Sequence, residues 1–175
     1  EAELDFYLQA TSWLSGYAAI DYDPTHNSKV FMNRGYVILG DLDKMPIYAA
    51  AGKMFAPFGN YASNMITEPM TRDIGRALVT AFEVGFVQAG DNAFHAETYA
   101  YNSLTKFTSN HKRHTEYGFD AGYNFKINSL VNGEIGASYI SNMADSQGIR
   151  TSLRMTNTLL TRNIPGLDAY GQLAI

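Results

Sequence analysis

The sequence lacks cysteine altogether and holds only five prolines among its 175 residues. The absence of cysteine excludes a disulfide framework and thiolate ligands for a metal. No apolar run approaches the roughly 18 residues that would indicate a membrane-spanning helix, so we expect no helical membrane protein. Basic residues are also sparse, with a net charge of -4 and no basic cluster larger than residues 111–114. Because a nucleic-acid surface needs a broad basic patch, we expect no nucleic-acid partner.

Aromatic residues and glycine are plentiful instead. The chain has 12 Tyr, 10 Phe and 15 Gly, and only 17% of its residues are charged. This composition is typical of a strand-rich protein rather than of a helical bundle. The length suits one domain, and no composition break divides it, so we expect residues 1–175 to form a single all-β domain.

Apolar and polar residues alternate along most of the chain, as they do in strands with one polar face. Residues 116–127 show this most clearly, with aromatic or aliphatic residues at every second position. The pattern predicts nine strands in all. They cover residues 1–10, 14–22, 30–40, 47–55, 77–89, 93–102, 116–127, 134–142 and 167–175.

The connections between these strands alternate in length. Those at 11–13, 41–46, 90–92 and 128–132 are short, and those at 23–29, 57–76, 106–115 and 143–165 are long. Outer-membrane barrels have short periplasmic turns and long extracellular loops, whereas soluble barrels have no reason to keep their long loops at one end. We therefore expect an antiparallel, up-and-down transmembrane β-barrel in the cell outer membrane. Bacterial barrels normally have an even strand count, so nine strands suggest a portion of a larger barrel, incomplete at both ends.

In each predicted strand, the charged and polar residues fall on one face. If these polar faces point inward, they line the lumen of the barrel. The wall would be acidic and favour cations, or its charges would pair across neighbouring strands and fill the interior, which is the commoner outcome. Tyrosines in the same rows can stack on a ligand or only fill space. The candidate lumen residues are Glu3, Asp5, Tyr7, Tyr17, Asp21, Arg34, Tyr36, Lys53, Glu83, His95, Glu97, Tyr99, Glu116, Asp120 and Lys126.

The long loop at residues 57–75 combines apolar side chains with a charged tip. Exposed apolar side chains on an outer loop would cost solubility, so we expect the loop to fold inward or over the barrel mouth. Its apolar residues, Phe58 among them, would brace the wall. Its charged residues, Glu68, Arg72 and Asp73, are candidate gating contacts.

This loop also carries a family resemblance. Residues 46–76, PIYAAAGKMFAPFGNYASNMITEPMTRDIGR, resemble the LbtU-type siderophore porins of Gram-negative outer membranes. Weaker similarities lie at 4–23, 35–41 and 163–168, so the resemblance covers most of the chain. It implies an outer-membrane barrel associated with ferric-siderophore uptake. It supplies no ligand-binding residues.

From the pattern and the resemblance together, we expect a porin-like barrel that takes up a ferric siderophore or small solutes. A soluble β-barrel carrier of small ligands and a structural or adhesive barrel are the alternatives. The expected partners are outer-membrane lipid, lipopolysaccharide and a ferric siderophore, with a homo-oligomer or an envelope complex as the candidate assembly. Lys106 and residues 111–114 would contact lipopolysaccharide phosphates or attract an anionic complex.

No pattern indicates catalysis. The chain has no nucleophile elbow and no phosphate-binding loop, so we expect no enzyme and no cofactor. His111 and His114 have a spacing that suits a metal, but no carboxylate or third histidine lies nearby, and we expect no metal site. Four aromatic residues near strand ends are candidates either for a girdle at the membrane interface or for ordinary turn packing. These are Trp13, Tyr48, Phe55 and Phe58.

Overall fold

The computed structural model describes residues 2–23, 29–60, 70–105, 114–127, 131–156, 160 and 162–174. Nine strands form one sheet, and three short helical segments lie in its long connections. The strands are β1 (Ala2–Thr11), β2 (Leu14–Asp23), β3 (Lys29–Leu39), β4 (Ile47–Phe55), β5 (Leu78–Val87), β6 (Ala93–Asn102), β7 (Thr115–Lys126), β8 (Asn132–Ile140) and β9 (Gly166–Ala174). The helical segments are α1 (Met70–Gly75), the 3-10 helix η1 (Met143–Asp145) and α2 (Gln147–Met155).

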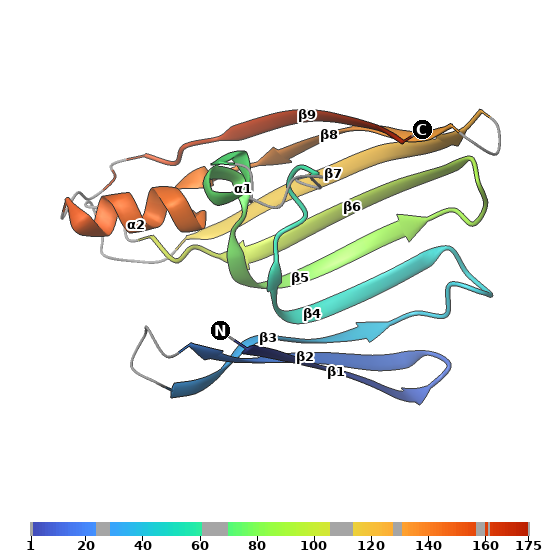
Figure 1. The fold of residues 1–175 in the computed structure, drawn as a ribbon, viewed down its shortest axis with the longest axis horizontal. Helices are drawn as coiled ribbons and strands as arrows, with labels where there is room; N and C mark the ends of the chain where they lie inside the picture. The colour runs from blue at the N-terminus through green and yellow to red at the C-terminus, as the bar shows by residue number, and fades with distance from the viewer. Residues whose placement is uncertain are drawn as a thin grey trace.

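Each strand pairs antiparallel with the next one along the chain, in the order β1 to β9. The predicted all-β, up-and-down arrangement is therefore confirmed. The sheet is not closed, because β1 and β9 lie at opposite edges. The short turns lie at one end of the sheet and the long connections with α1 and α2 lie toward the other (Figure 1).

The predicted strand limits agree closely with the structure, and those of β4 and β6 are the same. Residues 143–165 showed no clear period, yet part of this segment forms η1 and α2. The sequence pattern missed these helices because each is too short for a helical period to stand out. Among the described residues, no helix is long and apolar enough to cross a membrane.

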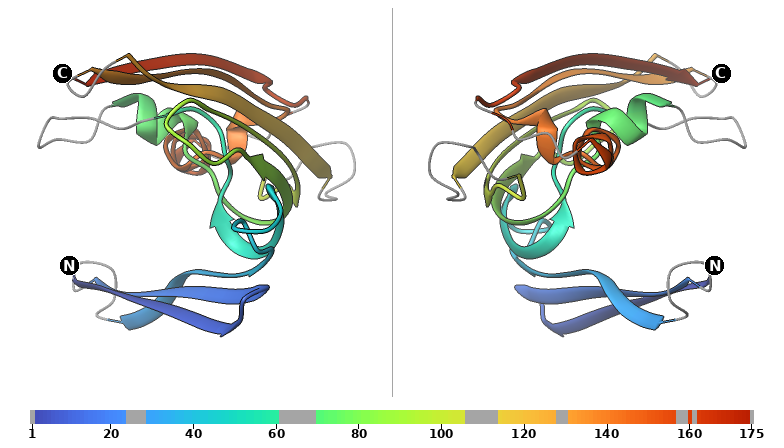
Figure 2. Two further views of the ribbon diagram at one scale, coloured as in Figure 1. Left: turned by 90° about the vertical axis from the view of Figure 1, so that its right-hand side faces the viewer. Right: turned by 90° about the vertical axis from the view of Figure 1, so that its left-hand side faces the viewer.

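The sheet curves strongly, and α1 and α2 lie inside the hollow (Figure 2). Its convex face is apolar and exposed: Phe82 is 56% exposed, Phe119 48% and Leu167 80%. Acidic side chains are buried on the concave face, among them Glu83 and Asp120. The concave face thus buries carboxylates beside an apolar cluster that includes Met54 and Val79, while the convex face exposes large apolar side chains.

The connection after β4 also enters the hollow. Phe58 is 4% exposed and belongs to the buried core, and the backbone N–H of Gly59 donates to Ser138 Oγ of β8 at 2.7 Å. Next to it, Asn60 Nδ2 donates to Glu134 Oε2 at 2.8 Å. The prediction that this loop folds inward is therefore confirmed for its first residues.

Four ring side chains on the concave face lie over glycines of the neighbouring strand. Each ring and its glycine are direct cross-strand partners, and a Cβ at the glycine would come within 2.3–2.5 Å of the ring. Glycine is needed at these positions because any side chain would occupy the space of the ring. The pairs are Tyr48 with Gly85, Tyr99 with Gly118, His95 with Gly122, and Tyr170 with Gly136.

Candidate binding pocket on the concave face

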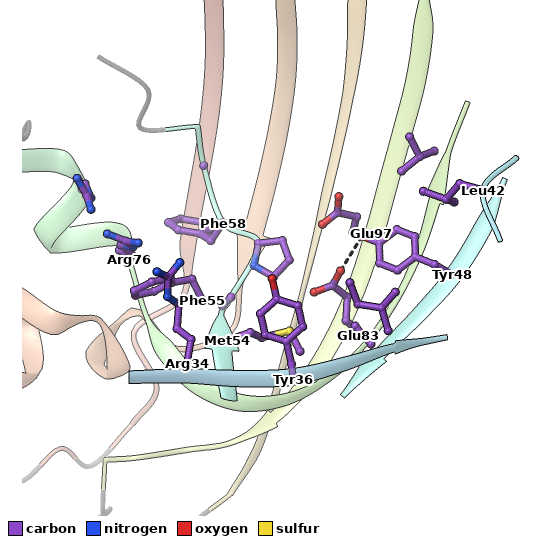
Figure 3. A pocket seen from close by; sticks show the side chains of 17 residues that line it. Arg34, Tyr36, Leu42, Tyr48, Met54, Phe55, Phe58, Arg76, Glu83 and Glu97 are labelled. Carbon is purple, nitrogen blue, oxygen red and sulfur yellow. Dashed lines mark hydrogen bonds between the residues drawn. The ribbon is translucent and has the colours of Figure 1, made fainter. Parts of the chain in front are cut away.

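A pocket of about 730 Å³ lies between the inner face of β3 to β6 and the segments that fold into the hollow. Its volume is within the range of small-molecule sites in proteins. The walls between its two ends are largely apolar and aromatic, with Tyr36, Met54 and Phe58 among the lining residues (Figure 3).

One end of the pocket is acidic. Glu83 of β5 and Glu97 of β6 both line it. Tyr48 of β4 reaches over Gly85, and its hydroxyl donates to Glu83 Oε1 at 2.7 Å. Glu83 and Glu97 lie on neighbouring strands. The cross-strand partner of Glu97 is Gly85, which lies two residues after Glu83 and therefore on the same face of the sheet. The sheet register therefore places two acidic groups side by side.

The other end is basic. Arg34 of β3, Arg72 of α1 and Arg76, just beyond α1, line the pocket there. The guanidinium carbons of Arg76 and Arg34 lie 3.4 and 5.6 Å from the ring centroid of Phe55, within the range of a cation-π interaction. Figure 3 shows Arg34 and Arg76 on the side of α1, away from Glu83 and Glu97.

Arg34 is held by its neighbours on β1 and β2. Its Nη2 donates to Glu3 and lies 3.7 Å from Asp5 Oδ1, and its guanidinium lies 5.2 Å from the centroid of Tyr17. The Nε atom of Arg34 is buried and has no hydrogen-bond partner among the described residues. One donor of this guanidinium thus stays unused.

A β-bulge determines which side chains of β3 reach this face. Ala19 pairs with Arg34 while the next residue, Ile20, pairs with Met32, so Asn33 is the extra residue. Its side chain donates to Asp21 Oδ2 at 2.7 Å. Unbroken alternation would place Phe31 on the same face as Val37, whereas the bulge brings it opposite Asp21.

A second cluster lies next to the pocket, between β6 and β9. Tyr170 Oη donates to Asp120 Oδ1 at 2.8 Å. His95 Nε2 lies 3.4 Å from Tyr170 Oη, 3.5 Å from Asp120 Oδ1 and 3.6 Å from Glu134 Oε1. Together with Asn60, these residues line a smaller cavity of about 230 Å³. The contacts connect the inward-folded segment to the wall.

Most of the predicted lumen residues share the concave face. In β1 to β3 the acidic and aromatic members lie on the same face as Arg34, and in β5 to β7 they line the hollow. Tyr7 lies opposite Tyr17 but is exposed at the sheet edge, and Lys126 reaches Asp91 in the β5–β6 turn at 2.9 Å. The members that the sheet brings to this face are Glu3, Asp5, Tyr17, Asp21, Arg34, Tyr36, Glu83, His95, Glu97, Tyr99, Glu116 and Asp120.

The assignment of faces was wrong in β4. Lys53 pairs with Gly35 on the convex face, and its Nζ donates to the carbonyl of Met32 at 3.1 Å. Ala50 and Met54 lie on the opposite, inner face of β4 and are buried in the core. The error arose because the polar residue was taken to mark the inner face, whereas here small and apolar residues fill it.

Of the predicted gating contacts, Arg72 lines the pocket. Glu68 and the side chain of Asp73 lie outside the described part of the chain. So do Lys106 and residues 111–113 of the basic loop.

The four aromatic residues near strand ends take different positions in the structure. Trp13 is exposed at a short turn, where Lys44 Nζ lies 5.8 Å from its ring centroid. Tyr48, Phe55 and Phe58 point into the hollow instead and line the pocket. The pattern could not separate the two roles, because both place aromatic residues near strand ends.

Sequence reasoning missed the basic end of the pocket as a group. Arg76 was not singled out, and Arg34 and Arg72 were assigned to separate features. The prediction that the loop folds inward was itself a signal for this end, because the arginines of the loop would fold inward with it.

The described residues contain no group of three or more His, Asp or Glu side chains suited to a metal ion.

Comparisons with known proteins find similar chains of greater length. A UPF0422 protein of Coxiella burnetii is 45% identical over 177 residues, which cover 99% of this chain and 38% of that protein. UPF0422 proteins of Legionella pneumophila strains Lens and Paris are 33% and 32% identical over 86% of this chain and 29% of each protein. The chain therefore spans well under half the length of these relatives. No family model matches it, and no solved structure matches it.

Proposed function

We propose that this chain forms part of the wall of an outer-membrane β-barrel that conducts small solutes, ferric siderophores among them, through its polar interior. The observation that carries the proposal is the apolar, exposed convex face of the sheet, opposite a concave face that buries carboxylates. Carboxylates such as Glu83, Glu116 and Asp120 are buried on the concave face, while large apolar side chains cover the convex face. An apolar surface of this extent requires a hydrophobic environment, and lipid supplies one.

The position of the connections supports the same proposal. All short turns lie at one end of the sheet and the long connections at the other, which is the arrangement of outer-membrane barrels. The long segments after β4 and β8 turn back into the hollow, where they would narrow a passage.

Closure of the barrel would come from further strands that pair with β1 and β9. Both edges of the sheet have an unpaired side, and the curated relatives are more than twice as long as the region that they share with this chain. An open sheet edge inside a membrane would leave backbone groups without partners, so the proposal requires these strands.

Fractionation and conductance test the proposal. Full-length protein should sediment with the outer membrane, resist a carbonate wash and produce conductance steps in planar lipid bilayers. Cells that depend on it should take up radioactive iron from a catecholate or a hydroxamate siderophore more slowly when it is deleted. Protein that stays in aqueous solution without detergent would overturn the proposal in favour of a soluble carrier, and a barrel without conductance would favour a structural role.

A further inference from the structure

The pocket has a positively charged end, a negatively charged end and an apolar stretch between them. This combination indicates the class of its ligand. Arg34, Arg72 and Arg76 line one end, and Glu83 and Glu97 line the other. We propose that the pocket binds a zwitterionic solute, with an anionic group at the arginines and a cationic group at the glutamates. The inference rests on the proposed function, because the pocket would then lie in the lumen on the path of the solute.

The basic end is suited to a carboxylate or a similar planar anion. A guanidinium binds such groups with two parallel hydrogen bonds. Arg34 uses Nη2 on Glu3 and has a buried Nε without a partner among the described residues. The ring of Phe55 lies against the guanidinium groups of both Arg34 and Arg76, which limits their motion. An anion there would meet groups that are already oriented.

The acidic end is suited to an ammonium group. Glu83 and Glu97 lie on adjacent strands, and the hydroxyl of Tyr48, which donates to Glu83, is an uncharged partner that supplies no positive charge to either carboxylate. Like charges held close together repel, and a cation between them relieves that repulsion. Among the residues that the structure describes at this end of the pocket, none has a basic side chain. The cation is therefore expected from the solute.

The stretch between the two ends selects against short, fully hydrated ions. Met54 and Phe58 are buried in the core, and Ile38 packs against it. A solute with a hydrocarbon middle would bury apolar surface here, which favours its binding. A doubly negative or doubly positive solute of the same length would place one charge beside a like charge.

Three probes of equal chain length separate these cases: aminohexanoate with one charge of each sign, adipate with two carboxylates, and hexanediamine with two ammonium groups. Equilibrium dialysis against the detergent-solubilised full-length protein should show at least about threefold more aminohexanoate retained than either other probe, corresponding to about 0.7 kcal/mol. Flux of the same probes out of protein-containing liposomes provides the second readout.

Two substitutions should move the preference in opposite directions. Glu97→Gln removes a carboxylate from the acidic end and should shift retention toward adipate, whereas Arg72→Gln should shift it toward hexanediamine. Asp91→Asn and Lys126→Gln are the matched controls, because each removes the same charge at the short-turn end, outside the pocket. Neither control should alter the ranking of the probes.

The two readouts distinguish failure of this inference from failure of the proposed function. Equal retention of all three probes, or equal shifts in the controls, would overturn the zwitterion site even if the liposomes conduct. A preserved preference in dialysis without any flux would support the site and count against a pore.

Discussion

The ring of Tyr48 occupies the space above Gly85 that any larger residue would need. A Cβ at Gly85 would lie 2.3 Å from two carbons of that ring, and the two residues are direct partners across β4 and β5. The same placement lets the hydroxyl of Tyr48 reach Glu83 at 2.7 Å. The shape of the acidic end of the pocket thus depends on a residue without a side chain.

Replacing Gly85 with alanine should destabilise the protein by about 1–3 kcal/mol, since the added methyl group overpacks the wall and displaces Tyr48. Thermal unfolding in detergent, followed by the loss of strand circular dichroism, measures the change. Gly16→Ala is the control, because a Cβ there meets its nearest atom at 3.9 Å. Adding Tyr48→Ala to the Gly85→Ala variant should recover part of the loss, and a purely additive result would contradict the proposed clash.

Arginine at Phe82 or Phe119 should cost about 2–4 kcal/mol if these convex-face residues lie at the bilayer midplane. Both are about half exposed in the sheet. The same substitution at Asn124, which pairs with Glu134 on the concave side, should be far milder. Chemical unfolding from lipid vesicles gives all three values. Equal costs at the three positions would show that the convex face is not in lipid.

Ser138→Ala should loosen the segment that crosses the hollow after β4. The substitution removes the acceptor of the Gly59 N–H, and an unsatisfied donor in a partly buried position costs about 1–3 kcal/mol. We expect larger fluctuations of single-channel current with little change in the amount of assembled protein. Ser15→Ala, at a half-buried serine of β2, is the control and should leave the current unchanged. An unchanged current in Ser138→Ala would indicate that the segment does not restrict the passage.

Lys44→Gln should reduce stability in a pH-dependent manner. Lys44 Nζ lies 2.6 Å from Asp41 Oδ2, and this hydrogen bond, with the charge of the lysine, holds the pKa of Asp41 below its ordinary value. The contribution is fully present above the unfolded carboxyl pKa of about 3.9 and is lost as the pH falls through the lower folded pKa. The difference in Tm between the parent and the variant should therefore be constant above about pH 5 and shrink in more acidic buffer. A difference that persists unchanged under acid conditions would assign it to another contact of Lys44, such as that with Trp13.

Much of the fold follows from local pattern, and the failures have identifiable causes. Alternation found all nine strands because successive side chains of a strand point to opposite faces, and this period is visible in any short window. It assigned Lys53 to the wrong face because a single charged residue in an otherwise apolar strand does not identify the inner side. Unbroken alternation also fails for Phe31, because one extra residue, Asn33, changes the faces on either side of the bulge.

The sequence by itself determined the strands, the alternation of polar and apolar residues along them, and the inward course of the first loop residues. Each of these depends on neighbours along the chain. Only the tertiary structure decided which side chains meet. Arg34 and Arg76 are far apart in sequence, and they converge on Phe55 because the chain turns back into the hollow after β4. Glu83 and Glu97 lie side by side because the β5–β6 register places them there. Register depends on contacts summed over the whole sheet, and no local stretch of sequence encodes it.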